Sequence, residues 1–131
     1  MKYLLDTNVI SDIFKRHPVT VGHFAGHPAS DLALCTITVF EVEFGLTENP
    51  ASRSRHAELW NELLSNLTVL EFSTLDAASA ARVRLQTAAQ PIGPSDTLIA
   101  GVALARGLTV VTNNTAEFGR VLGLNVVDWR G

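Results

Sequence analysis

The chain has 131 residues, of which 47% are hydrophobic and 18% are charged, and its formal net charge is −3. This length predicts one domain with one sizeable core, and the composition excludes a disordered chain. The acidic balance argues mildly against a protein that holds nucleic acid mainly by neutralising phosphates, because such proteins are usually basic.

Targeting and redox signals point to the cytoplasm. No apolar run reaches the roughly 18 residues needed to span a bilayer, and Asp6 follows Met1 too closely for a signal peptide. The single cysteine, Cys35, excludes an internal disulfide and is typical of a reducing compartment. We therefore expect a cytoplasmic protein with no membrane partner.

Short apolar runs alternate with helical patterns along the whole chain. In order, the sequence predicts a strand at 2–5, helices at 8–16 and 19–26, a strand at 32–36, helices at 38–46 and 51–64, a strand at 68–72, a helix at 74–89, a helix that starts at 95 or 96 and ends at 106, a strand at 108–111, a helical turn at 115–121 and a strand at 124–127. Thr36 or Thr38 is expected to cap the helix at 38–46, and Gly107 is the residue type favoured just past a helix end.

Nearly continuous apolar strands that alternate with helices are typical of a parallel sheet covered on both faces. We therefore predict an α/β fold in which residues 1–131 form a single domain. Its core is a parallel twisted sheet of about four to five strands, flanked by helices on both faces.

Four acidic residues stand at or next to junctions between predicted strands and helices: Asp6, Glu41, Asp96 and Glu117. In open α/β sheets, ligands bind beyond the carboxyl ends of strands, which is where Asp6 and the segment of Glu117 fall. Carboxylates that converge at such an edge raise one another's pKa, and a shared cation stabilises them. The pattern predicts a magnesium site, which in turn suggests phosphodiester chemistry.

Each acid also has a simpler explanation. Asp6 and Asp96 could serve only as residues that start a helix, and Glu117 alone would be a routine acid of a first helical turn. Glu41 shares a largely apolar helix face, where a carboxylate is costly without a partner. Helical periodicity alone, however, does not decide whether Glu41 or Glu43 points inward.

Two other kinds of site are disfavoured. His23 and His27 have the spacing of a zinc-ligand pair, but His27 precedes a proline and Cys35 is the only thiol. A phosphoacceptor receiver domain needs a lysine near a late strand, whereas the only lysines are Lys2 and Lys15.

Four segments carry motifs in a fixed order: 4–11 (LLDTNVIS), 37–45 (ITVFEVEFG), 92–100 (IGPSDTLIA) and 110–118 (VVTNNTAEF). Together they resemble the motifs of PIN domains, specifically the VapC-like toxins of bacterial type II toxin–antitoxin systems. In the second motif a glutamate stands four residues before a glycine, and that spacing selects Glu41 over Glu43. The resemblance covers nearly the whole chain.

The resemblance implies an endoribonuclease toxin that hydrolyses RNA phosphodiester bonds with Mg²⁺ or, alternatively, Mn²⁺. Asp6, Glu41 and Asp96 would hold the metal, directly or through waters. Asp6 and Asp96 are the expected direct ligands, because magnesium typically takes only one or two protein carboxylates. Glu117 stands where many relatives have aspartate, and it is expected to assist, directly or through a water.

Three neighbouring polar residues, Asn8, Thr112 and Asn113, are expected to orient the carboxylates by hydrogen bonds. The resemblance further implies a small cognate antitoxin, a homodimeric toxin and a toxin–antitoxin hetero-oligomer. Two alternatives remain open: a catalytically inactive PIN-fold binding module and a structure-specific DNA nuclease.

Overall fold

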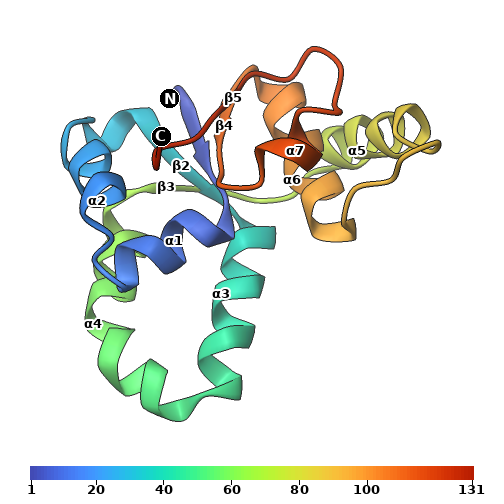
Figure 1. The fold of residues 1–131 in the computed structure, drawn as a ribbon. Helices are drawn as coiled ribbons and strands as arrows, with labels where there is room; N and C mark the ends of the chain where they lie inside the picture. The colour runs from blue at the N-terminus through green and yellow to red at the C-terminus, as the bar shows by residue number, and fades with distance from the viewer.

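The computed structural model describes all of residues 1–131 (Figure 1). The strands are β1 (Tyr3–Leu5), β2 (Leu32–Cys35), β3 (Thr68–Leu70), β4 (Thr109–Val111) and β5 (Val126–Val127). The helices are α1 (Thr7–Phe14), α2 (Pro18–Ala25), α3 (Thr36–Glu48), α4 (Pro50–Asn66), α5 (Thr74–Gln86), α6 (Pro94–Arg106) and α7 (Thr115–Phe118), with a 3-10 turn at Ala29–Asp31. No helix is long and apolar enough to cross a membrane.

All five strands are parallel and lie in the order β3-β2-β1-β4-β5. Leu4 of β1 is in register with Ala33 of β2 on one side and Val110 of β4 on the other. From β1 the chain builds the sheet in one direction as far as β3 and then returns to build β4 and β5 in the other. The strand order therefore reverses between β1 and β4, and open α/β sheets bind ligands at such a point. The predicted α/β fold with a parallel sheet is confirmed.

Helices cover both faces of the sheet and enclose two apolar cores (Figure 1). Because successive side chains of a strand point to opposite faces, Leu4 and Leu5 enter different cores. Leu5 packs with residues of α1, α3 and α4, among them the buried Trp60. Leu4 packs with residues of α5, α6 and α7, among them Ile99. The carboxyl end of β1 is thus held between two packed layers.

The start of α3 differs from the prediction. The helix begins at Thr36, and Cys35 precedes it without a side-chain capping bond, so the expected threonine cap is wrong. The Thr36 hydroxyl instead accepts a hydrogen bond from the Phe72 backbone N–H at 3.2 Å. The buried Thr38 hydroxyl donates to the Leu5 carbonyl at 3.5 Å. Both threonines therefore connect α3 to segments that are distant in the sequence.

Candidate active site

Asp6 lies at the carboxyl end of β1, beside the end of β4. Its backbone N–H donates to the Val111 carbonyl at 2.9 Å, which joins the two strand ends. Only 3% of Asp6 is exposed. Its Oδ1 accepts from the Thr7 backbone N–H at 2.8 Å, so Asp6 does cap α1. Its Oδ2 accepts from the Thr112 hydroxyl at 2.8 Å and from the Asn8 amide at 3.2 Å. Three donors therefore fix the orientation of this carboxylate.

Burial raises the pKa of Asp6 above its usual value of 3.8. The hydrogen bonds from Thr112 and Thr7 oppose that shift, and the nearby charge of Glu41 adds to it. The net direction is upward, as expected for a desolvated carboxylate that faces a second one. A cation at this place would reverse the shift.

The two glutamates of α3 point in different directions. Glu41 Oε1 accepts a hydrogen bond at 2.5 Å from the hydroxyl of Thr7, the residue that follows Asp6 in the chain. Glu43 instead accepts from Trp60 Nε1 at 2.6 Å and from Arg53 at 3.3 Å. The structure thus brings Glu41 to the site and uses Glu43 to hold α3 against α4.

Asp96 and Glu117 meet at a shared amide. Asp96 is the third residue of α6, and Glu117 is the third residue of α7. The Asn114 side-chain amide donates to Asp96 Oδ2 at 2.9 Å and also to Glu117 Oε2. Asn114 also donates its backbone N–H to the Thr112 hydroxyl at 2.9 Å, which links this pair to the residues around Asp6.

The pKa of Asp96 is raised to about 7. Burial is the largest cause, followed by the charge of Asp6 and by a hydrogen bond to Glu117. The pKa of Glu117 is lowered, because it accepts hydrogen bonds from Asn114 and from the Asp96 carboxyl. In the metal-free protein one proton is therefore held on Asp96 and shared with Glu117, as is usual for neighbouring carboxyls.

One of the expected orienting residues is placed differently. The prediction that Asn113 orients a site carboxylate is wrong for its side chain, whose amide donates to Asp12 at 3.1 Å. Only its backbone N–H supports the site, through the Asn8 side-chain oxygen at 3.0 Å. Asn114 makes the carboxylate contacts that were expected of its neighbour. The sequence signal was the adjacent pair of asparagines, which does not show which amide faces the acids.

The donor set fits magnesium. Carboxylates supported by hydroxyl and amide groups are hard oxygen ligands of the kind that Mg²⁺ prefers. The structure has no group of three or more His, Cys, Asp or Glu side chains that could hold a metal by themselves. An ion held here would therefore have to complete its coordination with waters, as magnesium typically does.

The histidines lie away from this site. His23 and His27 both stack on the ring of Trp129, with centroid distances of 5.8 and 5.3 Å. His27 Nδ1 also lies 2.7 Å from the His23 carbonyl oxygen. Their spacing reflects packing around a tryptophan, and neither ring approaches the four acids as a ligand.

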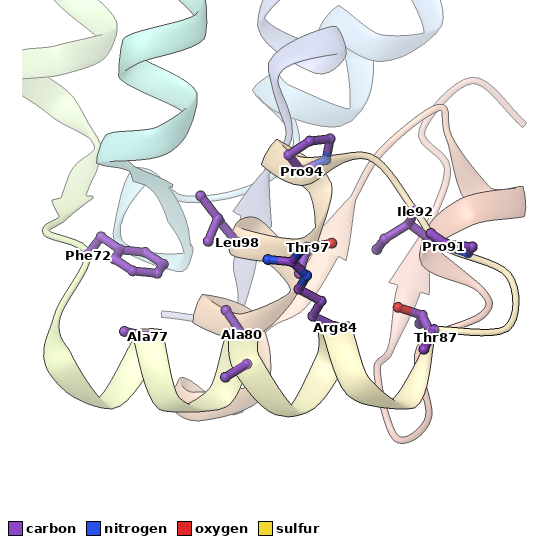
Figure 2. Close-up of a pocket in the computed structure, with 12 residues that line it drawn as sticks. Phe72, Ala77, Ala80, Arg84, Thr87, Pro91, Ile92, Pro94, Thr97 and Leu98 are labelled. Atoms are coloured by element: carbon purple, nitrogen blue, oxygen red, sulfur yellow. The ribbon is translucent and has the colours of Figure 1, made fainter.

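Two cavities flank the acids. The larger, about 740 Å³, lies between α5 and α6, and Pro91 and Ile92 of the connecting loop line one end of it (Figure 2). Its lining is mostly apolar, and none of the four acids contributes to it. The smaller, about 220 Å³, lies among α1, α3 and α4 and includes Thr7 and Glu41. Of these two cavities, only the smaller is lined by one of the four acids, Glu41.

Comparison with known proteins agrees with this geometry. Residues 3–123 match the family model described as PIN domain. The chain is 34% identical over 131 residues to the tRNA(fMet)-specific endonuclease VapC of Shigella flexneri, with 98% of both chains covered. It is 32% identical to ribonuclease VapC2 of Haemophilus influenzae, again with 98% of both covered.

Solved structures give the same result. The DNA-bound VapBC structure from Salmonella typhimurium has a chain that is 33% identical, with a TM-score of 0.89 over 98% of both chains. The structure of VapBC2 from Rickettsia felis, bound to a DNA fragment from its promoter, gives 28% identity and a TM-score of 0.86. The match covers 98% of this chain and 99% of that one.

A parallel sheet with acids gathered where its strand order reverses defines a nuclease of the PIN class. The chain belongs to the PIN-domain family and, within it, to the VapC ribonucleases. It is accordingly a phosphodiester hydrolase, and metal dependence is a general property of its family. The predicted family is confirmed, while the metal ion and the role of each acid stay predictions.

Proposed function

We propose that this protein is a magnesium-dependent endoribonuclease toxin, with Mn²⁺ as an alternative ion. The observation that carries the proposal is the convergence of Asp6, Glu41, Asp96 and Glu117 where the strand order reverses. Two of these carboxyls have raised pKa values, which is the electrostatic condition that a bound cation relieves.

Each residue has a task in this proposal. Asp6 and Asp96 hold the ion, and bound magnesium lowers the pKa of a water and stabilises charge on the phosphate. Thr112 and Asn8 fix Asp6 by their hydrogen bonds. Asn114 positions Asp96 together with Glu117 and receives no direct role in the reaction. Glu41, held by the Thr7 hydroxyl, faces the same space and assists.

The relatives support RNA as the substrate. The Shigella relative is described as specific for tRNA(fMet), which makes initiator tRNA the first substrate to test. The intact set of acids favours catalysis over a purely binding role, and the ribonuclease relatives favour RNA over DNA.

We also propose a small antitoxin as the partner, in analogy with the VapBC complexes. The toxin would act as a homodimer and form a toxin–antitoxin hetero-oligomer in the cytoplasm. An acidic pocket on a cytotoxic nuclease calls for a cover that brings its own positive charge.

The test compares cleavage of tRNA and of matched single-stranded DNA, with magnesium or with EDTA. The wild type should cut only RNA and only with the metal. Asp96→Asn should abolish both the cleavage and the rise in melting temperature that magnesium causes by binding the folded state. Asp31→Asn is the control. Asp31 directly precedes β2, so it lies at the amino ends of the parallel strands, away from the acids, and it pairs with Lys2.

The other outcomes separate the alternatives. An Asp96→Asn protein that cuts at the wild-type rate would refute the site assignment. A wild type that binds RNA without cutting it would support the binding module, and cleavage of DNA alone would support the DNA nuclease.

A further inference from the structure

The smaller cleft is lined by Glu41 of the acidic site and by Lys15, a cation that no carboxylate neutralises. We propose that the RNA strand next to the scissile bond lies in this cleft and that Lys15, which lines it, and Arg16, the next residue along the chain, bind a backbone phosphate. This inference rests on the proposed function, because it assigns the path by which that substrate reaches the acids.

Polar residues from three helices line the cleft. On α1, Thr7 and Ser11 line it at i and i+4, and Lys15 follows at i+8. Residues with this spacing share one face of a helix. Eight residues of helix span roughly 12 Å, so this stripe leads from the acids outward over that distance. Its far end carries a positive charge.

The other lining residues come from α3 and α4, the two helices drawn below the sheet with α1 in Figure 1. Glu41 and Gly45 line the α3 side, and a Cβ atom at Gly45 would meet nothing within 4 Å, so the cleft is open there. Ser52 and His56, also four residues apart, line the α4 side. Hydroxyl and imidazole groups thus line the side that faces the α1 stripe.

A flat aromatic wall stands beside the polar groups. The His56 ring stacks on Phe14 with a centroid distance of 4.8 Å and an interplanar angle of 6°. Burial and the neighbouring Arg55 lower the pKa of His56, so the ring is neutral at pH 7. A neutral ring offers hydrogen bonds to a base or ribose, and aromatic groups are the usual partners of unpaired RNA bases.

The two cations are free to act. Four basic residues make ion pairs in this structure: Lys2, Arg53, Arg106 and Arg130. Lys15 and Arg16 are exposed and make none, and no ion pair is made either by Arg55, Arg82, Arg84 and Arg120. Lys15 is the only lysine or arginine that lines the cleft. In a molecule with a net charge of −3, a phosphate that approaches four carboxylates needs local positive charge.

Arg16 adopts a left-handed backbone conformation, which residues other than glycine disfavour. It is the only non-glycine residue with a positive φ, at 56°. A hydrogen bond that the His17 backbone N–H donates to the Asp12 carbonyl at 2.9 Å closes the turn at this position. The same left-handed position after α6 is occupied by Gly107, at φ 67°. A residue with a Cβ is strained in this region, and such strain is often retained where a side chain is needed for function.

The chemistry of the lining favours RNA over a protein segment. Only Phe14, Val42 and Leu46 are hydrophobic among the residues that line the cleft. A docked amphipathic helix requires a mainly apolar groove, whereas a nucleic-acid strand is matched by cations, hydroxyls and one aromatic wall.

The experiment measures RNA binding in EDTA and cleavage in magnesium for two matched variants. Lys15→Gln should weaken binding of a labelled single-stranded RNA about 5- to 10-fold and raise KM similarly, with kcat within about twofold. The slope of log Kd against log salt should fall by about 0.7, the value for one lost phosphate contact on a single strand. Lys2→Gln, which changes the only other lysine, should leave the RNA affinity, KM, kcat and the salt slope unchanged.

Arg16→Gly is a second variant, which removes a positive charge and relieves backbone strain at the same time. Glycine adopts the left-handed conformation readily, so the melting temperature should not fall while RNA binding weakens. Equal RNA binding and equal salt slopes for Lys15→Gln and Lys2→Gln would overturn the inference. Loss of affinity for the antitoxin alone would assign the cleft to a protein and also overturn it. A wild type that binds RNA through Lys15 without cutting it would count against the proposed function instead.

Discussion

Asp96 carries a proton near neutral pH because three causes act on one carboxyl. Burial disfavours its charge, Asp6 repels it, and Glu117 accepts its proton in a hydrogen bond. Asn114 keeps Asp96 and Glu117 together by donating to both. The metal-free site is therefore poised to release a proton when a cation enters, which couples metal binding to pH.

This coupling gives a stability test for Asp96. Its folded-state pKa, about 7, lies above the ordinary value of 3.8. The stability contributed by the protonated carboxyl is complete below about pH 4 and is lost as the pH rises toward 7. In EDTA, Asp96→Asn should therefore match the wild type at pH 4 and exceed it at pH 8. We expect about 1–2 kcal/mol, less than the full shift implies because the group is partly exposed. Urea unfolding at both pH values measures it, and an equal difference at both would contradict the assignment.

The two glutamates of α3 should separate activity from stability. Glu41→Gln should reduce RNA cleavage by about 10²-fold or more, because the pocket loses a carboxylate at the reacting phosphate. Glu43→Gln should leave cleavage nearly unchanged. It should instead lower the free energy of unfolding by about 1 kcal/mol, because Trp60 and Arg53 lose a charged acceptor. Measuring kcat and urea unfolding for both variants shows which glutamate serves catalysis and which serves stability. The reverse pattern would show that Glu43 serves the site.

At the scale of elements, α6 carries Asp96 and is positioned by close contact with α5. Gly101 of α6 packs directly on Ala80 of α5: a Cβ atom at 101 would lie 2.6 Å from the Ala80 Cβ and 2.7 Å from its backbone. Real side chains do not approach that closely, so only glycine permits this spacing. The position of Asp96 therefore depends on a residue one and a half turns along the same helix.

Gly101→Ala tests this dependence. Overpacking at a rigid contact typically costs about 1–3 kcal/mol, so urea unfolding should show a loss of that size. A displaced α6 would carry Asp96 with it, because both belong to one rigid helix. The rise in melting temperature caused by magnesium should therefore also shrink. Gly22→Ala is the matched control: it lies in α2 with nothing within 4 Å of its would-be Cβ. Alanine there should be neutral or stabilise by up to about 1 kcal/mol. Equal effects of the two substitutions on the free energy of unfolding would show that α5 shifts to accept the added methyl group without loss of stability.

Local patterns predicted most elements because buried parallel strands are uninterrupted apolar runs. The run Leu32–Cys35 is one such strand, and Gly107 ends α6 with a positive φ as its residue type suggested. The cap of α3 was not predictable. Thr36 and Thr38 bond to groups that lie more than thirty residues away, and no local pattern encodes those partners.

The site shows the same limit on a finer scale. Asp6 and Asp96 could be located because each stands where a strand or loop passes into a helix. The choice between Asn113 and Asn114 depends on the turn after β4, in which successive side chains point to different neighbours. One such residue faces Asp12 and the next faces the acids, and only the folded turn decides which.

On the scale of the whole molecule, a protein with a net charge of −3 gathers four acidic residues at the site that an anionic substrate has to approach. In the proposed function magnesium would resolve this conflict for RNA, and an inhibitor could resolve it with its own cation. A guanidinium group presents paired donors that match a carboxylate. We therefore expect an arginine of the antitoxin to lie between Asp6 and Asp96, in the place that the metal would otherwise occupy.

Competition between that arginine and magnesium must then be reciprocal, because linkage couples two binding equilibria equally. Raising magnesium should weaken the affinity of the antitoxin, and the antitoxin should weaken magnesium binding by the same factor. The titration has to be made at constant ionic strength, because added salt alone also screens charge. Changing the arginine to alanine should remove the magnesium dependence while the antitoxin still docks. A flat titration with the intact antitoxin would mean that it covers the site sterically and leaves Asp6 and Asp96 to their metal.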